Sequence, residues 1–271
     1  MSCPECRFFA QEALEKQGGV TYNKCEKSEK GRRDMDRKKR IPIGIENFKE
    51  MVDMDYYFVD KTLMIRDLLD QAGKVNLFTR PRRFGKTLNL SMLRYYFEDT
   101  GDAALNEEHR RLFDGLAISD AGERYTEEMQ RYPVIFLTLK SAKQISFEYS
   151  FGRMKESIAK EFARHENAVI STLKNAGDVE KYQAIRGRKA DDAEYYTAIA
   201  FLSDCLYEVY GKKCILLLDE YDVPLENAYF QGFYGEMIAF IRSLFESVLK
   251  TNDSLQLPSL PAACASAGNP Y

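Results

Sequence analysis

A basic loop that ends in Gly85, Lys86 and Thr87 holds the residue types best suited to bind a phosphate group. Glycine lets the backbone approach a phosphate closely. The lysine supplies a cation for the β- and γ-phosphates of a nucleotide, and the threonine hydroxyl can bind Mg²⁺. We therefore predict a phosphate cradle that runs from Arg83 through Phe84 to Thr87. Within it, Lys86 would also act in catalysis and Thr87 would be a metal ligand.

The loop departs from the pattern G-x-x-x-x-G-K-[ST] at its first glycine, where this chain has Arg80 followed by Pro81. Arginine tolerates a positive φ poorly and proline has no N–H, so the loop must begin with a different turn. A Gly-Lys-Thr triplet alone often only caps a helix. Its surroundings favour phosphate binding, because the β-prone run 75–79 precedes it and residues 88–97 follow with apolar side chains at helical spacing. A loop between a strand and a helix directs free N–H groups and the positive end of the helix dipole at one point.

A second stretch supplies carboxylates. The apolar run at residues 214–218 (C-I-L-L-L) is followed directly by Asp219 and Glu220. Runs that are apolar on both faces are typical of central parallel strands, and ligands bind at the carboxyl ends of such strands. We predict that Asp219 is a Mg²⁺ ligand, usually through water, and that Glu220 is a catalytic residue that polarises the attacking water. The simpler explanation of these two acidic residues is an ordinary acidic turn after a strand. The order of the two motifs and their separation of about 130 residues nevertheless fit one ATP or GTP site.

Three segments together resemble one protein family. They read R-P-R-R-F-G-K-T, L-L-L-D-E-Y-D-V-P, and I-P-I-G-I-E-N-F followed by Y-Y-F-V-D-K-T. They look like the AAA-ATPase-like domain of bacterial and archaeal proteins, over residues 41–256. In that family the arginine-proline opening is the usual form, and full-length members often carry a C-terminal nuclease-like domain of the PD-(D/E)xK type. The resemblance implies a P-loop NTPase fold and makes residues 57–62 candidates for contact with the base or ribose. Packing of these aromatic residues onto the edge of the sheet is an equally good explanation.

The remaining sequence predicts the elements that must position the site. Residues 134–139 (V-I-F-L-T-L) read as a second buried strand. Apolar stripes at helical spacing predict helices over residues 154–162, 199–209 and 236–250. Residues 175–192 are polar and lack periodicity, which indicates a loop. Strands that alternate with helices predict an α/β fold, with a mainly parallel sheet flanked by helices on both faces.

Composition excludes several classes of protein. The chain has 271 residues, 45% of them hydrophobic and 30% charged, as in an ordinary globular protein. A net charge of −3 gives no overall attraction to nucleic acid or anionic lipid. No apolar run approaches the ~20 residues of a membrane span, and no signal peptide is evident. Six cysteines do not suggest a disulfide framework, so we expect a cytoplasmic protein. His109 and His165 lie among charged residues, which favours solvated helix faces over catalysis.

Residues 1–40 differ in character from the rest of the chain. Cys3 and Cys6 have the spacing of half a zinc site and Cys25 could be a third ligand, but a structural site needs four. A loose, reduced tail explains them better. Residues 24–40 then hold nine Lys or Arg against four Asp or Glu. Such a run could contact nucleic acid, although a solvated linker is its commoner meaning. We therefore expect residues 1–40 to be a flexible basic appendage.

Residues 257–271 (L-P-S-L-P-A-A-C-A-S-A-G-N-P-Y) have no charge and neither helical nor strand periodicity. The resembled family continues at this point with a strand, and codons for that strand can spell this tail when read one base over. We therefore expect a disordered tail and hypothesise a frameshifted, truncated reading frame. In that case the chain would lack the strand after the acidic one, the polar residue on it that senses the γ-phosphate, and the nuclease-like region.

These observations predict an ATP-binding P-loop domain that uses Mg²⁺ and converts nucleotide binding into a conformational signal. The chain would be an ATP hydrolase, forming ADP and phosphate, if the truncated site can still catalyse hydrolysis. The alternative is a nucleotide-dependent scaffold without turnover. A nuclease is disfavoured, because no apolar run carries the required (D/E)-x-K. The expected partner is an unidentified protein or a second subunit.

Overall fold

The computed structural model describes residues 39–71, 75–79, 85–249 and 263–267. Contacts divide the chain into Met1–Lys39 and Arg40–Tyr271, and all described helices and strands belong to the second unit. The predictions for Cys3, Cys6, Cys25 and the basic run before Lys39 lie outside the described residues.

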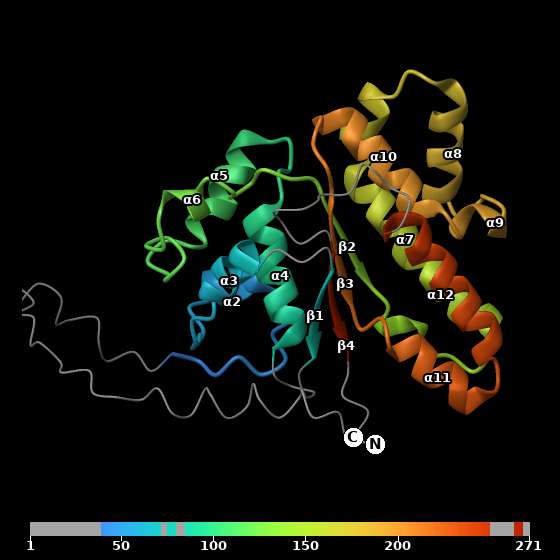
Figure 1. The fold of residues 1–271 in the computed structure, drawn as a ribbon, viewed down its shortest axis with the longest axis horizontal. Helices are drawn as coiled ribbons and strands as arrows, with labels where there is room; N and C mark the ends of the chain where they lie inside the picture. The colour runs from blue at the N-terminus through green and yellow to red at the C-terminus, as the bar shows by residue number, and fades with distance from the viewer. Residues whose placement is uncertain (1–38, 72–74, 80–84, 250–262, 268–271) are drawn as a thin grey trace, which may run out of the picture. The chain divides into compact units, whose positions relative to one another are not determined.

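Four parallel strands form the sheet in the described part of the chain, in the order β1-β4-β3-β2 (Figure 1). Their bounds are β1 Val75–Thr79, β2 Val134–Thr138, β3 Ile215–Asp219 and β4 Ala263–Ala267. The predicted strands at 75–79, 134–139 and 214–218 are therefore confirmed to within one residue. Because the strands are parallel, Thr79, Thr138 and Asp219 end at the same edge of the sheet, where ligands bind in open α/β folds.

The strand β4 corrects the expectation that residues 257–271 contain no strand. Ala263 to Ala267 pair with β1 on one side, and Asp219 of β3 pairs with Ser266 on the other. A strand between two neighbours makes ladder hydrogen bonds along both edges, so its position in the sheet outweighs the weak strand preference of alanine and serine. The chain therefore has a strand beside the acidic one.

One face of the sheet is covered by five described helices that lie between residues 48 and 126 (Figure 1). They are α2 Phe48–Asp53, α3 Leu63–Gln71, α4 Lys86–Phe97, α5 Ala103–Arg111 and α6 Glu123–Thr126. Their apolar side chains form one core with Val134, Ile215 and Leu217 of the strands.

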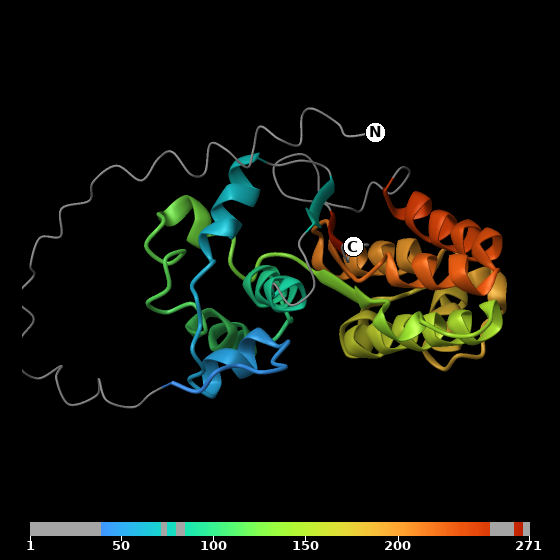
Figure 2. The same cartoon turned by 90° about the horizontal axis from the view of Figure 1, so that it is seen from below.

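The other face is covered by the helices that follow β2, and Figure 2 shows the two groups on opposite sides of the strands. They are the 3-10 turn η3 Lys140–Ala142 and the helices α7 Phe147–Thr172, α8 Ala176–Arg186, α9 Asp192–Tyr195, α10 Ala198–Tyr210, α11 Val223–Gln231 and α12 Tyr234–Leu249. Their core includes Ile135, Leu137, Leu216 and Leu218, the alternate residues of the same two strands. Successive strand residues point to opposite faces, so a continuous apolar run serves both cores.

Helix α8 contradicts the prediction of a loop over residues 175–192. Asn175 caps it by accepting a hydrogen bond from the Gly177 N–H at 2.9 Å. Tyr182 and Ile185 are fully buried, and the Tyr182 hydroxyl donates to the Phe162 carbonyl at 2.6 Å. Two buried residues that lie three positions apart form a very short apolar stripe, which an analysis of helical periodicity does not detect in a polar segment.

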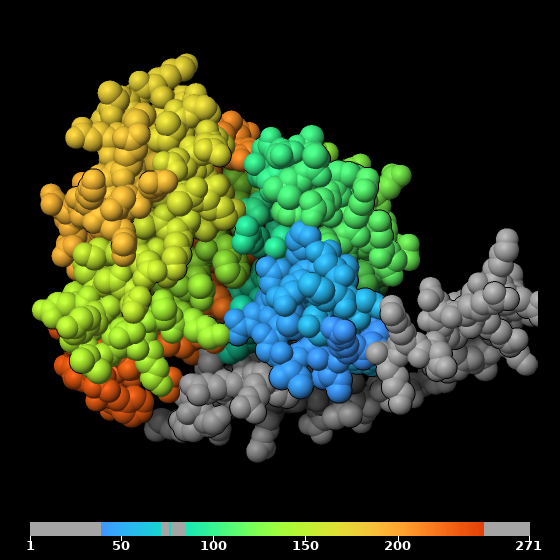
Figure 3. Space-filling model, turned by 180° about the vertical axis from the view of Figure 1, so that it is seen from behind, coloured from blue at the N-terminus to red at the C-terminus, as the bar shows by residue number. Residues whose placement is uncertain are grey.

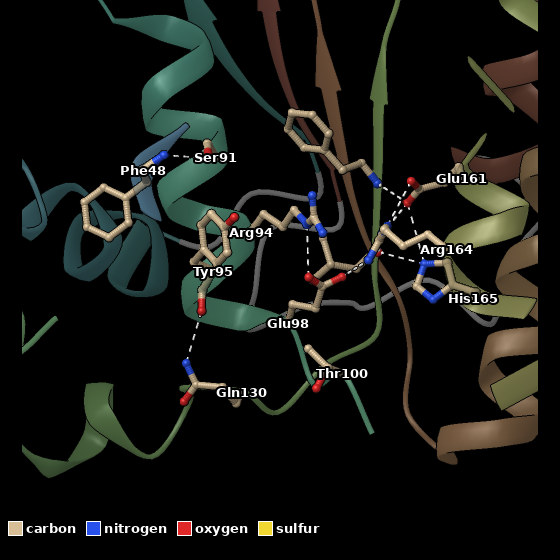
Figure 4. A network of polar contacts seen from close by, with 12 residues as sticks. Phe48, Ser91, Arg94, Tyr95, Glu98, Thr100, Gln130, Glu161, Arg164 and His165 are labelled. Carbon is tan, nitrogen blue, oxygen red and sulfur yellow. Dashed lines mark hydrogen bonds and ion pairs between the residues drawn. The ribbon is translucent and has the colours of Figure 1, made fainter. Parts of the chain in front are cut away.

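A group of charged side chains, three of them buried and two partly buried, covers the outer edge of β2, which ends the sheet among the described strands. We call it the β2-edge cluster: Arg94 and Glu98 of the α4 end, with Glu161, Arg164 and His165 of α7 (Figure 4). Arg164 donates to Glu98, to Glu161 and to the Val134 carbonyl, and the Phe136 N–H donates to Glu161 at 2.7 Å. The cluster therefore supplies partners to backbone groups of β2 that would otherwise be open to another strand.

Both histidines are buried, so the expectation of solvated helix faces is wrong for His109 and His165. The His165 Nε2 lies 3.2 Å from the Val134 carbonyl oxygen, within the β2-edge cluster. Burial first, and then the neighbouring Arg164, hold the pKa of His165 well below its usual value. Sequence alone does not reveal that this face of the helix meets unpaired backbone groups.

Candidate functional site

A cavity of about 1210 Å³ opens at the carboxyl ends of the strands. It is lined by Gly85, Lys86 and Thr87 at the start of α4, by Lys140 and Lys143 after β2, by Glu220 after β3, and by residues of the segments 42–46 and 57–61. On the face drawn in Figure 3, the blue segment that follows Arg40 lies against the lime-green part of the chain that follows β2. Residues far apart in the sequence thus share one cavity of a size suited to a small-molecule ligand.

The Gly85-Lys86-Thr87 triplet forms the beginning of α4. Gly85 is the N-cap, with a left-handed backbone at φ 72°. A Cβ added there would meet no atom within 4 Å, so the backbone angle rather than space favours glycine. The first N–H groups of a helix have no partners within the helix, and they lie here at the cavity. The predicted cradle residues Arg83 and Phe84 lie outside the described residues.

Thr87 and Asp219 lie side by side although 132 residues separate them. The Thr87 hydroxyl donates to Asp219 Oδ2 at 3.0 Å, and Asp219 is only 1% exposed. A hydroxyl and a carboxylate are hard oxygen ligands of the kind that Mg²⁺ prefers, so this pair fits the predicted ion. In the described residues no group of three or more His, Cys, Asp or Glu could hold a metal. A Mg²⁺ at this pair would therefore need water or phosphate oxygens as well.

Glu220 follows Asp219 directly and lines the cavity. Its φ of 53° is left-handed, which is uncommon for a residue other than glycine and often marks a functional position. Burial, followed by repulsion from Asp219, raises the pKa of Glu220, while Lys140 opposes the rise. A raised pKa makes a carboxylate a stronger base, which suits the role predicted for Glu220.

Sequence reasoning missed an ion pair at the cavity. Lys140 Nζ lies 2.6 Å from Glu46 Oε1, and the two side chains are each 54% exposed. Lys140 could have been predicted from the sequence, because it follows the predicted strand at 134–139 and ligands bind at the carboxyl ends of parallel strands. No local pattern could have linked it to a glutamate 94 residues earlier.

The segment predicted to contact the base or ribose divides into two parts. Tyr57 and Val59 are 61% and 57% exposed and line the cavity. Asp60 instead accepts hydrogen bonds from the N–H groups of Thr62 and Ala117, both at 2.8 Å. Thr62 is fully buried. The first part therefore remains available to a ligand, whereas the second fixes the beginning of α3.

Comparisons with known proteins agree with this architecture. A family model described as "Predicted AAA-ATPase" matches residues 42–259. The chain is also 30% identical over 219 residues to an "Uncharacterized protein in vnfD 5'region" of Azotobacter chroococcum mcd 1. That alignment covers 80% of this chain and 36% of the relative, so the chain spans about a third of the relative's length. No solved structure matches the chain.

No helix within the described ranges is both long and apolar enough to cross a membrane. The family match covers most of the chain and includes both the Gly85-Lys86-Thr87 triplet and the Asp219-Glu220 pair. The chain therefore belongs to the family of predicted AAA-ATPases.

Proposed function

We propose that residues 41–256 form an ATP-binding P-loop domain whose Mg²⁺-dependent nucleotide binding and hydrolysis drive a conformational signal. The observation that carries this proposal is the 3.0 Å hydrogen bond between Thr87 and Asp219. It joins the end of a lysine-containing loop to the acidic end of a parallel strand, beside a cavity large enough for a nucleotide. Family membership supports nucleotide binding in general.

In this proposal the N-terminus of α4 binds the phosphates. The N–H groups of its first turn and the positive end of its dipole would face the negative charge. Lys86, which lines the cavity, would contact the β- and γ-phosphates. Arg83 and Phe84 remain proposed members of the cradle.

Thr87 and Asp219 would hold Mg²⁺, the threonine directly and the aspartate through water. The bound ion would neutralise charge on the phosphates. Asp219 is almost completely buried, which restricts the positions that its carboxylate can take. Its hydrogen bond with Thr87 keeps both oxygens at one point before an ion binds.

Glu220 would accept a proton from, or orient, the water that attacks the γ-phosphorus. Its side chain lines the cavity, and burial, followed by the charge of Asp219, raises its pKa, which makes the carboxylate a stronger base. The products would be ADP and phosphate.

Two neighbouring substitutions test this assignment of roles. Glu220→Gln keeps the shape of the side chain but removes the base, so ATP affinity should stay nearly constant while hydrolysis falls by roughly 10²–10⁴. Asp219→Asn should weaken Mg²⁺-dependent ATP binding as well as turnover. Titration calorimetry and steady-state phosphate release measure the two quantities.

Equal losses of binding in both variants would refute the assignment of separate roles to Asp219 and Glu220. Intact nucleotide binding without any phosphate release from the unmodified chain would instead support a nucleotide-dependent scaffold.

A further inference from the structure

Lys140 lies at the cavity because of the register of β2 and β3. Thr138, the last residue of β2, pairs with Asp219, the last residue of β3. The Leu139 N–H then donates to the Asp219 carbonyl at 3.0 Å and carries the pairing one residue further. Leu139 is therefore level with Glu220, the residue that follows β3, and Lys140 comes one residue later, at the start of η3. Lys140 and Glu220 both lie beyond the carboxyl ends of neighbouring strands, and both line the cavity.

The charges of Lys140 and the acidic pair act on each other. A hydrogen bond to Glu46 is the largest influence that raises the pKa of Lys140, and the charges of Glu220 and Asp219 raise it further. In the other direction, the Lys140 charge opposes the rise in the pKa of Glu220. Lys140 and Lys86 also line the same cavity. The Lys140 ammonium group is thus within electrostatic reach of the acids proposed to act at the terminal phosphate.

The present partner of Lys140 is easily exchanged. Its pair with Glu46 is 2.6 Å long, but both side chains are more than half exposed, and exposed ion pairs are weak. A triphosphate at the Lys86 site would bring additional negative charge toward Glu220, and therefore toward Lys140. A diphosphate lacks the group that would reach this end of the cavity.

Glu46 belongs to a segment that is tied to the helix of the phosphate loop. It precedes Asn47, the N-cap of α2, and the next N–H, that of Phe48, donates to Ser91 Oγ of α4 at 3.0 Å (Figure 4). The Lys140–Glu46 pair therefore joins the segment that lines one side of the cavity to the end of β2 on another side.

Building on the nucleotide site proposed above, we infer that Lys140 contacts the terminal phosphate of a bound nucleoside triphosphate and gives up its ion pair with Glu46. Through this contact, Lys140 is the residue that distinguishes a bound triphosphate from a bound diphosphate. Loss of the pair releases residues 42–46 from the end of β2, which is the first step of the conformational signal.

The test compares the affinities of Mg²⁺–AMPPNP and Mg²⁺–ADP by titration calorimetry in the full chain. Lys140→Ala should weaken AMPPNP binding about tenfold, the scale of one charge-assisted hydrogen bond, and change ADP binding less than about threefold. Glu46→Gln should have the opposite sign and strengthen AMPPNP binding, because Lys140 no longer has a competing carboxylate. In the double variant that combines Lys140→Ala with Glu46→Gln, the gain in AMPPNP affinity caused by Glu46→Gln should disappear.

Lys143→Ala is the matched control, since it removes the same charge from the same cavity three residues away. Circular dichroism verifies that each variant is folded. The inference is overturned if Lys140→Ala weakens AMPPNP and ADP equally, if Lys143→Ala gives the same triphosphate-selective loss, or if Glu46→Gln still strengthens AMPPNP binding without Lys140. Absence of binding of either nucleotide to the unmodified chain would overturn the proposed function, and this inference with it. Normal, Lys86-dependent binding without a triphosphate-selective effect of Lys140 would overturn the inference alone.

Discussion

The β2-edge cluster and the cavity both gather charged side chains around the same sheet, but they differ in what surrounds those charges. In the cluster, Glu98 and Glu161 are 2% and 7% exposed, and both contact Arg164. In the cavity, Lys140 and Glu46 form a pair that is more than half exposed. The cluster also binds backbone groups of β2, whereas the cavity residues lie at the ends of the strands.

This difference separates a structural set of charges from one suited to a ligand. A buried charge is costly unless it is paired and hydrogen-bonded. The side chains of the β2-edge cluster contact one another and the backbone of β2, and these contacts hold α4 and α7 against this strand. The cavity charges are exposed to solvent, and in the proposed function they would exchange it for phosphate oxygens. Perturbed pKa values occur in both places, at His165 and at Glu220, so a pKa shift alone does not identify the functional site.

The largest effect on stability is expected from Arg164→Met. It removes one partner of a buried ion cluster and leaves Glu98 and Glu161 without that cation, which typically costs about 3–5 kcal/mol of unfolding free energy. Urea denaturation measures the loss. The control is Arg153→Met on the same helix, where the pair with Glu156 is exposed and a loss below about 1 kcal/mol is expected. Equal losses for the two variants would remove the structural distinction between the cluster and a surface pair.

The next largest effect is expected from Lys86→Ala, and on binding rather than on folding. An ion-paired hydrogen bond of this kind contributes about 1.5–3 kcal/mol, so ATP affinity should fall at least tenfold. The unfolding free energy should change little, because Lys86 lies at the cavity. Titration calorimetry with ATP, together with circular dichroism, measures both. Unchanged affinity in a folded variant would refute the phosphate site.

The smallest effect concerns the pH dependence of stability. His165 has a pKa well below 6.5 in the folded chain, so below about pH 6.5 the unfolded chain binds a proton that the folded chain does not. The contribution of this residue to stability is therefore present above pH 6.5 and falls as the pH is lowered, by at most about 1.4 kcal/mol at pH 5.5. Arg164 lowers the pKa further, while the Val134 carbonyl opposes the shift.

His165→Gln should reduce the difference in unfolding free energy between pH 7.5 and pH 5.5 by that amount, as measured by urea denaturation at the two pH values. His109, whose pKa is also lowered, is present in both proteins and cancels in the comparison. An identical pH dependence in the variant would mean that His165 is not held neutral in the folded chain.

The parts of the fold that sequence predicted are those where apolar residues repeat. The stripe of Met154, Ile158 and Phe162 predicted α7, and the continuous run before Asp219 predicted β3. Strand β4 was missed because its pairing comes from the two neighbouring strands and not from its own side chains. Helix α8 was missed because only Tyr182 and Ile185 are buried along its length.

For the candidate site, sequence identified residues that stand in short motifs and missed those defined by spatial contact. Lys86, Thr87, Asp219 and Glu220 were nominated from two motifs, and Thr87 and Asp219 lie in contact. The pair of Lys140 and Glu46 depends on the register of β2 against β3 and on the path of the chain before α2, which residue spacing does not encode. The position of His165 was mispredicted for the same reason, since the spacing of polar residues along a helix does not show which of them face the edge of a strand.

The most direct test of the proposed nucleotide site is a calorimetric titration of the unmodified chain with ATP, carried out once with Mg²⁺ and once with EDTA. We expect one nucleotide per chain and tighter binding with Mg²⁺, because Thr87 and Asp219 would supply oxygen ligands for the ion beside the phosphates. No heat of binding under either condition, with the protein folded, would contradict the claim that this cavity is a nucleotide site.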